Sequence, residues 1–217
     1  MYLKRSSGKY KEYFGFTLAE VLITLLIIGV IASIVIPGLI ADTQNAELKV
    51  AWKKSYADIN LATKKILMDN GGSLRGLNIT SDNTIFRDMY LSNLSYIKKC
   101  ASSDQQSCWT NGITQNAGDS FPDNAAAILS NGVQLSFDYD DPNCGSSINT
   151  NYSAGIIKVC GAVQVDVNGS KGPNKIGKDV FGIYILENST KPYGSQGDGQ
   201  ENTCGTTGVG CAAQYLY

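Results

Sequence analysis

Residues 15–40 read GFTLAEVLITLLIIGVIASIVIPGLI, and none of the residues from Val21 to Ala41 carries a charge. An α-helix rises about 1.5 Å per residue, so this run of twenty-odd residues spans roughly 30 Å as a helix. That length matches the thickness of a bilayer's hydrocarbon core. We therefore expect residues 16–41 to form a transmembrane helix.

Charged residues flank the start of this apolar run. A basic leader precedes it, with Lys4, Arg5, Lys9 and Lys11 against a single acid, Glu12. Glu20 lies at the mouth of the run, where an ionisable group costs on the order of 2–3 kcal/mol in a membrane and usually marks a function. The leader ends before the apolar stretch, whereas a secretory signal peptide is cleaved after it. Apolarity alone leaves a plain, uncleaved membrane anchor as the alternative.

The segment Gly15-Phe16-Thr17-Leu18-Ala19-Glu20, followed by an apolar run, resembles the class III signal of type IV pilins and type II secretion pseudopilins. The resemblance implies that a prepilin peptidase cleaves after Gly15 and methylates the new N-terminus at Phe16. It also implies three parts: a leader (1–15), a transmembrane and filament-core helix (16–41) and a globular domain (42–217). Members of the family tend to have a proline well inside the apolar helix. Pro37 matches, and with Gly38 it is expected to kink the helix.

The resemblance implies a structural role as a subunit of a type IV pilus or a type II secretion pseudopilus. The implied partners are the prepilin peptidase, an inner-membrane assembly platform and other pilins or pseudopilins. Before assembly, the chain would cross the bacterial inner membrane once and place its C-terminal domain in the periplasm. In the assembled periplasmic or surface filament, a neighbour's N-terminal amine would neutralise the Glu20 carboxylate, since either charge buried alone is costly. We expect Glu20 to set the register between adjacent subunits.

Two other classes of function remain as alternatives. One is a membrane-tethered binding module, or a minor tip pilin, that does not polymerise; the other is a membrane-anchored enzyme. The chain has no histidine and no recognisable nucleophile elbow or carboxylate pair, which argues against an enzyme. A net charge of −1 gives no overall basic field for nucleic acid.

The expected fold is α+β and pilin-like, with one long helix packed on an antiparallel sheet of about four strands. Apolar residues recur at three- and four-residue steps over residues 42–70, which predicts that the helix continues and ends at Asn70-Gly71-Gly72. A second helix is expected from Ser81 or Asp82 to about Lys98, followed by a disulfide-pinned loop. Alternating or apolar stretches predict strands, and Asn131-Gly132 predicts a hairpin between the first two. These strands are residues 126–129, 133–139, 156–167 and 180–186.

All six cysteines follow the apolar run, and they favour disulfides formed in an oxidising compartment. They are Cys100, Cys108, Cys144, Cys160, Cys204 and Cys211. Six cysteines allow fifteen pairings. Pairing each with its neighbour in sequence is favoured because it closes short loops. The absence of histidine and of any Cys-x-x-Cys motif argues against zinc.

Residues 165–181 read VDVNGSKGPNKIGKDVF and resemble a D-x-N-G-x-x-G-P-N-x-x-G-x-D-x-F loop found in many pilin-like proteins. Asp166, Asn168 and Asp179 offer hard oxygen ligands, and the glycines allow backbone carbonyls to converge, as calcium sites require. Some major pseudopilins bind calcium in a comparable loop with a different motif. The alternative is a tight glycine–proline turn held by Asx hydrogen bonds. No other cofactor is expected.

Overall fold

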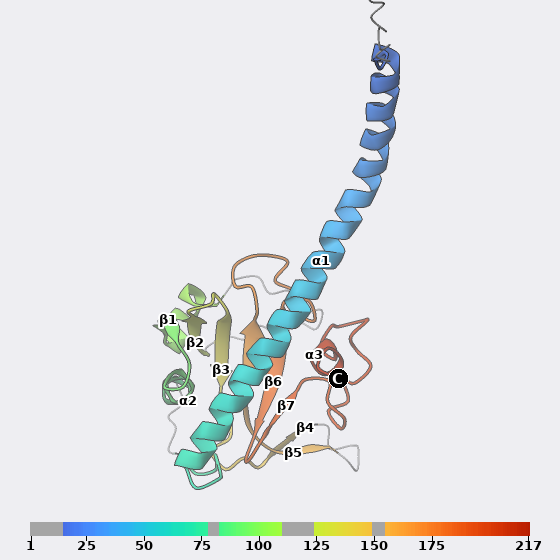
Figure 1. Cartoon of the computed structure of the whole chain (residues 1–217). Helices are drawn as coiled ribbons and strands as arrows, with labels where there is room; N and C mark the ends of the chain where they lie inside the picture. The colour runs from blue at the N-terminus through green and yellow to red at the C-terminus, as the bar shows by residue number, and fades with distance from the viewer. Residues whose placement is uncertain (1–14, 78–82, 110–123, 149–154) are drawn as a thin grey trace, which may run out of the picture. The chain divides into compact units, whose positions relative to one another are not determined.

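The computed structural model describes residues 15–77, 83–109, 124–148 and 155–217 (Figure 1). It divides into two compact units, Met1–Gln44 and Asn45–Tyr217. The first helix, α1 (Leu18–Asp69), is 52 residues long and continues through Pro37, so it contributes to both units.

Residues 18–44 of α1 are exposed around the whole circumference of the helix, apart from the half-buried Ala32. The exposed fraction is 77% at Leu18, 74% at Ile34 and 68% at Leu26. By length and composition, α1 is the one helix among the described residues that is long and apolar enough to cross a membrane. The fold of the chain itself provides almost no cover for this part of the helix.

The second unit is built on one sheet, to which the described residues contribute seven strands. The strands are β1 (Tyr96–Cys100), β2 (Ala125–Leu129), β3 (Gln134–Asp138), β4 (Ser146–Ile148), β5 (Ile156–Asp166), β6 (Val180–Leu186) and β7 (Thr190–Pro192). Their order across the sheet is β1-β2-β3-β5-β6-β7, with β4 also paired to β5, and all these pairs are antiparallel. The predicted hairpin is confirmed: β2 and β3 pair directly, and Gly132 has the positive φ that its turn requires.

The predicted α+β class and long helix are confirmed, but the prediction of about four strands was wrong. The four expected strands correspond to β2, β3, β5 and β6, and the sheet also contains β1, β4 and β7. The helix expected to reach Lys98 ends earlier, since α2 is Thr84–Leu91 and β1 follows it. Side chains of Ser92 and Asn93 hydrogen-bond to the Met89 carbonyl, an arrangement that competes with further helix. β4 and β7 have three residues each, too few to show an alternating pattern.

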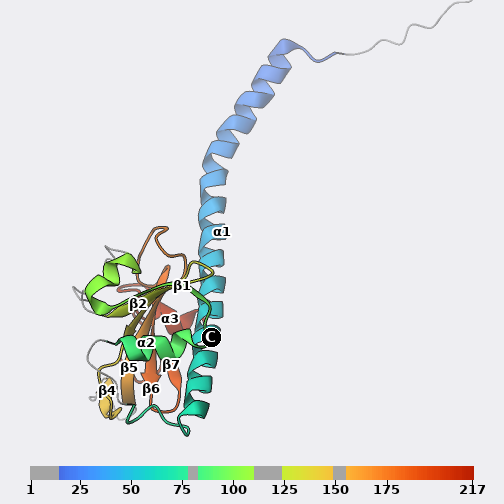
Figure 2. The ribbon, with the colours of Figure 1, turned by 90° about the vertical axis from the view of Figure 1, so that its left-hand side faces the viewer.

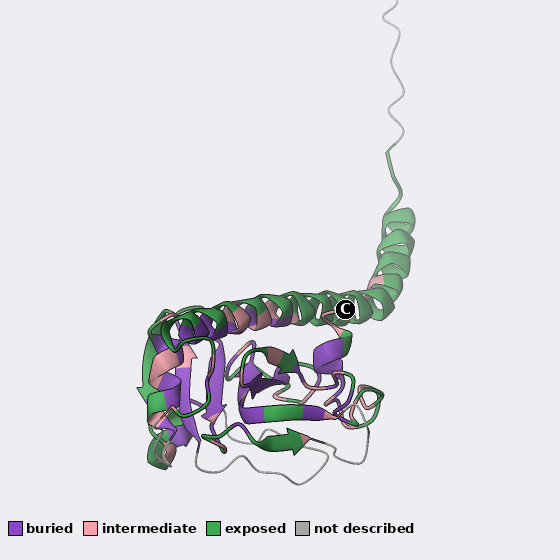
Figure 3. Cartoon of the chain, turned by 90° about the horizontal axis from the view of Figure 1, so that it is seen from below, coloured by how far each residue is buried: buried purple, intermediate pink, exposed green. Residues whose placement is uncertain are grey.

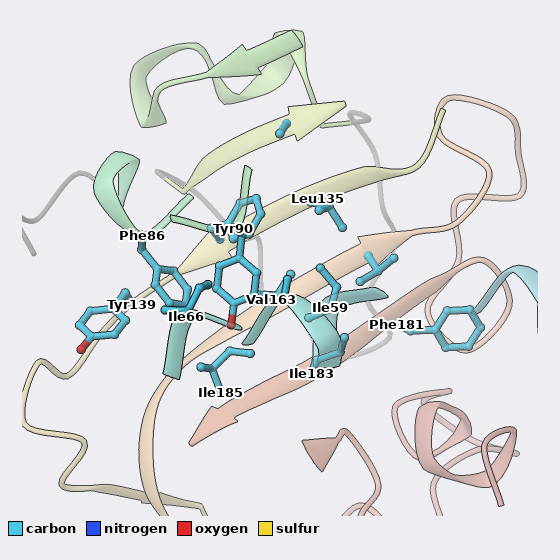
Figure 4. Close-up of a cluster of buried hydrophobic side chains, with 14 of the residues drawn as sticks. Ile59, Ile66, Phe86, Tyr90, Leu135, Tyr139, Val163, Phe181, Ile183 and Ile185 are labelled. Atoms are coloured by element: carbon cyan, nitrogen blue, oxygen red, sulfur yellow. The ribbon is translucent and has the colours of Figure 1, made fainter. Parts of the chain in front are cut away.

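The second half of α1 packs on one face of the sheet, as Figures 2 and 3 show. Its buried residues form one stripe: Trp52, Ser55, Ile59, Ala62, Thr63, Ile66 and Leu67. The indole of Trp52 stacks on the Phe181 ring with 4.6 Å between centroids, and its Nε1 donates to the Ala212 carbonyl at 2.9 Å. Deeper in this core, the Thr63 hydroxyl is 2.8 Å from the Tyr90 hydroxyl. Figure 4 shows the Tyr90 ring beside that of Phe86. The helix ends as predicted, with Gly72 N–H donating to the Leu67 carbonyl at 2.7 Å.

The opposite face of the sheet is also buried but carries polar side chains. Gln134 and Ser136 on β3 lie opposite Asp166 and Gln164 on β5, and all four are less than a tenth exposed. The short helix η1 (Ser102–Ser107) contributes Gln105, whose Nε2 donates to the Ser136 hydroxyl at 3.1 Å. The two faces of the sheet therefore differ in chemistry, although both are excluded from solvent.

Candidate functional site

Glu20 belongs to a capping box at the start of α1. The backbone N–H and the hydroxyl of Thr17 both donate to Glu20 Oε2 at 2.8 Å, and the Glu20 N–H donates back to the Thr17 hydroxyl at 3.2 Å. Thr17 is the N-cap and Glu20 is the third helical residue, the spacing that this reciprocal motif requires. The sequence prediction singled out Glu20 but missed Thr17, although the Thr-x-x-Glu signal was present.

The peptide bond between Gly15 and Phe16 lies just before this cap. Both residues are exposed, Phe16 to 89%. No heavy atom of the rest of the chain lies within 4 Å of the position that a Cβ on Gly15 would occupy. In the described part of the chain, nothing therefore covers the bond at which the sequence predicts cleavage.

Residues 11–36 match the family profile described as the prokaryotic N-terminal methylation motif. The chain carries a class III prepilin-type signal. The match includes Gly15, Phe16 and Glu20 and ends one residue before Pro37. No curated protein and no solved structure matches the chain.

The prepilin-type signal supports a precursor similar to a type IV pilin or pseudopilin. It implies processing by a prepilin peptidase and assembly with other pilins. Together with the apolar part of α1, it fits a membrane-anchored, pilin-type protein. It also suggests a structural, non-enzymatic role.

Downstream of the signal, three disulfides close short loops of the globular unit. Cys100 bonds to Cys108, and Cys144 bonds to Cys160. Cys204 bonds to Cys211 in the third bridge, which completes the nearest-neighbour pattern favoured from the sequence. The first bridge lies against Trp109, Ala126 and Val180 on the polar side of the sheet. The bridges thus join residues that are only 7 to 16 positions apart in the sequence.

The three predicted calcium ligands lie in or beside the loop between β5 and β6, where their side chains form hydrogen bonds with backbone groups of the loop. The two carboxylate oxygens of Asp179 accept the backbone N–H groups of Lys175 at 2.6 Å and Asn174 at 2.8 Å. Asp166 Oδ1 accepts the Asn168 N–H at 3.2 Å, and Asn168 Nδ2 donates to the Gly172 carbonyl at 3.2 Å. These are the Asx hydrogen bonds of the alternative interpretation, and they hold the turn in shape.

The electrostatics of the loop centre on Asp166, which is fully buried. Burial raises the pKa of Asp166 to about 7, and the nearby Asp179 carboxylate adds to the rise. Within the described residues, no group of three or more Asp, Glu or Cys side chains lies close enough together to hold a metal ion. A cation in this loop would therefore need amide and backbone oxygens in addition to carboxylates.

Proposed function

We propose that the chain is a structural subunit of a type IV pilus or a type II secretion pseudopilus. The observation that carries the proposal is the prepilin-type signal, placed directly on a helix whose apolar surface the chain leaves uncovered. Cleavage after Gly15 would remove the basic leader and give a mature chain that begins at Phe16, with residues 42–217 as the globular domain.

The apolar surface of residues 18–44 supports assembly through helix packing. In the membrane precursor, lipid would cover this surface; in a filament, the same helices from neighbouring subunits would replace the lipid. Side-chain packing, rather than a hydrophobic driving force, favours such an exchange, because lipid tails are as apolar as leucine. The charged end of the helix then decides how neighbouring subunits align.

Glu20 is the proposed alignment group. Its carboxylate accepts two hydrogen bonds from Thr17 and keeps capacity to accept more, since two carboxylate oxygens offer about four acceptor sites. The N-terminal ammonium of a processed neighbour would neutralise it in the low-dielectric filament core. Pro37 and Gly38 remain the proposed point at which α1 bends or stretches as the subunit leaves the membrane.

The proposed location before assembly is the bacterial inner membrane, crossed once, with the globular domain in the periplasm. The three disulfides support an oxidising compartment for that domain. An inner-membrane assembly platform would extract the subunits and add them to the filament.

The test is Glu20→Ala in a cell that processes and assembles the wild-type chain. We expect normal insertion into the membrane, because the substitution makes the segment more apolar, and loss of the chain from sheared filaments. Membrane fractionation and immunoblotting of the filament fraction measure the two steps separately.

The matched control is Asp42→Asn, which also removes one negative charge from an exposed position on α1 but lies beyond the apolar run. We expect it to assemble as the wild type does. Normal incorporation of Glu20→Ala, or an equal loss with Asp42→Asn, would remove Glu20 from the proposed role.

A further inference from the structure

A small cavity of the globular unit lies where α1 meets the C-terminal segment and the loop between β5 and β6. Its volume is about 150 Å³, and it is lined by Asn45, Lys49, Lys178 and Tyr215. Pockets for drug-sized ligands begin at about 300 Å³, so this one suits a compact group. Two of its lining side chains are ammonium groups, and the other two, an amide and a phenol, can donate hydrogen bonds. The cavity therefore offers the charge and the donors that a small anion needs.

Both lysines are positioned by neighbouring groups. Lys49 Nζ lies 4.4 Å from the centre of the Tyr215 ring, within the range of about 6 Å for a cation–π interaction. Lys178 belongs to a braced turn, in which its N–H donates to the Lys175 carbonyl at 3.0 Å and the next residue, Asp179, accepts two backbone amides. Among the described residues, neither ammonium group forms an ion pair with a carboxylate. Two positive charges thus line one cavity without a negative partner from the described part of the chain.

The place of the cavity along α1 indicates the source of the anion. Asn45 follows Ala41, the last residue of the uncharged run, by four residues, or about 6 Å of helix. The headgroup layer of a bilayer extends about 5–7 Å beyond the hydrocarbon core on each side. Side chains on a helix tilt toward its N-terminus, so Lys49 reaches back toward the apolar run. With residues 16–41 in a membrane, the lipid headgroups are therefore within reach of the cavity.

We propose that the cavity binds the phosphate group of an anionic phospholipid. Lys49 and Lys178 supply the positive charge, as lysines do at many phosphate sites, and Asn45 and Tyr215 donate hydrogen bonds to the phosphate oxygens. A zwitterionic lipid binds less well, because its own ammonium group meets two like charges. Releasing the bound lipid is then part of extracting the subunit from the membrane. The inference rests on the membrane anchor of the proposed function.

The test uses the full chain, with its disulfides intact, in micelles of a neutral detergent. Phosphatidylglycerol and phosphatidylcholine are added in equal amounts, and native mass spectrometry measures the dissociation constant of each. We expect phosphatidylglycerol to bind at least about fivefold more tightly. Lys49→Gln and Lys178→Gln should each weaken its binding about fivefold, since a lysine near an anionic lipid surface contributes about 1 kcal/mol.

Two other lysines provide matched controls. Lys54→Gln removes an exposed lysine from α1, and Lys171→Gln removes one from the same loop as Lys178; neither residue lines the cavity. Both variants should bind phosphatidylglycerol within about twofold of the wild type. Equal binding of the two lipids, or an equal loss in the control variants, would overturn the proposal.

Inorganic phosphate separates a lipid site from a site for a free anion. A large excess of phosphate should leave the bound phosphatidylglycerol in place. Displacement of the lipid by phosphate at the lipid's own concentration would assign the cavity to a free anion and overturn the proposal.

Flotation of the chain with phosphatidylcholine vesicles keeps this inference apart from the proposed function. A chain that floats with the vesicles but shows no preference for phosphatidylglycerol would refute the lipid site alone. A chain that does not float would contradict the membrane anchor, and both proposals would fall.

Discussion

The two halves of α1 share one continuous helix but meet their surroundings in opposite ways. Residues 18–44 leave their apolar side chains exposed on nearly all sides, whereas residues 45–69 bury one stripe against the sheet. Trp52 is fully buried, while Leu26, which lies earlier on the same helix, is 68% exposed. The contrast shows that the second half is stabilised by its own chain and that the first half needs a cover from outside.

The same contrast separates the free energy of folding from that of assembly. A substitution in the second half should change the unfolding of the globular unit. A substitution in the first half should leave that unfolding unchanged and act on insertion or on contacts with other helices.

The largest expected effect follows from Trp52→Ala. Removing a buried tryptophan typically costs 3–5 kcal/mol, and here it also removes the hydrogen bond to the Ala212 carbonyl. Leu26→Ala, in contrast, should change the free energy of unfolding by less than about 0.5 kcal/mol. Urea unfolding of the full chain in micelles, followed by tyrosine fluorescence and circular dichroism, measures both.

Trp52→Phe is the control for this comparison, since it keeps a stacked ring opposite Phe181 and loses the indole donor. Its free energy of unfolding should lie between those of the wild type and Trp52→Ala. Equal destabilisation by Trp52→Ala and Leu26→Ala would show that the two halves fold as one unit.

A smaller effect on the free energy of unfolding of the globular unit is expected from a change in pH. Burial raises the pKa of Asp138 to about 7, and the neighbouring carboxylate of Asp140 adds to the rise. Between about pH 4 and pH 7 the folded chain therefore holds a proton that the unfolded chain has released, so stability falls as the pH rises through this window. Asp138→Asn should make this fall in the free energy of unfolding less steep. The change in slope should stay below about 1.4 kcal/mol per pH unit, the limit for one proton, because the carboxylate is partly exposed.

Asp88 provides the matched control for the pH measurement. Partial burial opposes the shift, but hydrogen bonds and attraction from Lys99 and Arg87 lower the pKa of Asp88, so this group favours folding above about pH 4. Asp88→Asn should leave the fall between pH 5 and 7 in place. If Asp138→Asn shows the same slope as the wild type in that window, Asp138 does not hold the extra proton.

The smallest expected effect is at the start of α1, in the capping box that Thr17 and Glu20 form. Thr17→Val removes the hydroxyl that joins Thr17 to Glu20, and loss of an N-cap costs about 1 kcal/mol. Amide hydrogen exchange in the first turn of α1 should become about fivefold faster, with no change in the unfolding of the globular unit. Thr17→Ser keeps the oxygen and should exchange at nearly the wild-type rate. Unchanged exchange in Thr17→Val would show that the capping box does not hold the start of the helix.

Much of this architecture could be predicted because it rests on long or local signals. The uncharged run after Glu20 and the apolar spacing of the second half define α1, and Asn131-Gly132 defines the β2–β3 hairpin. The nearest-neighbour disulfides follow from short loops. Each of these patterns is set by residues close together in the sequence.

The remaining features depend on contacts between distant parts of the chain. Residues 96–98 of β1 were predicted as helix because Ile97 continues the apolar spacing of α2, and pairing with β2 decides their conformation. The burial of Gln164 was not predicted, because a glutamine in an alternating strand carries no signal until its partners are known. Thr17 was missed although its capping motif is local and visible in the sequence.

The central claim is that the first half of α1 becomes the N-terminal, filament-core helix of a processed subunit. The most direct test is mass spectrometry of the N-terminus of the mature chain, isolated from a bacterium with a working prepilin peptidase. The account predicts a chain that begins at Phe16 and is N-methylated there. A chain that still begins at Met1 in those cells would contradict it.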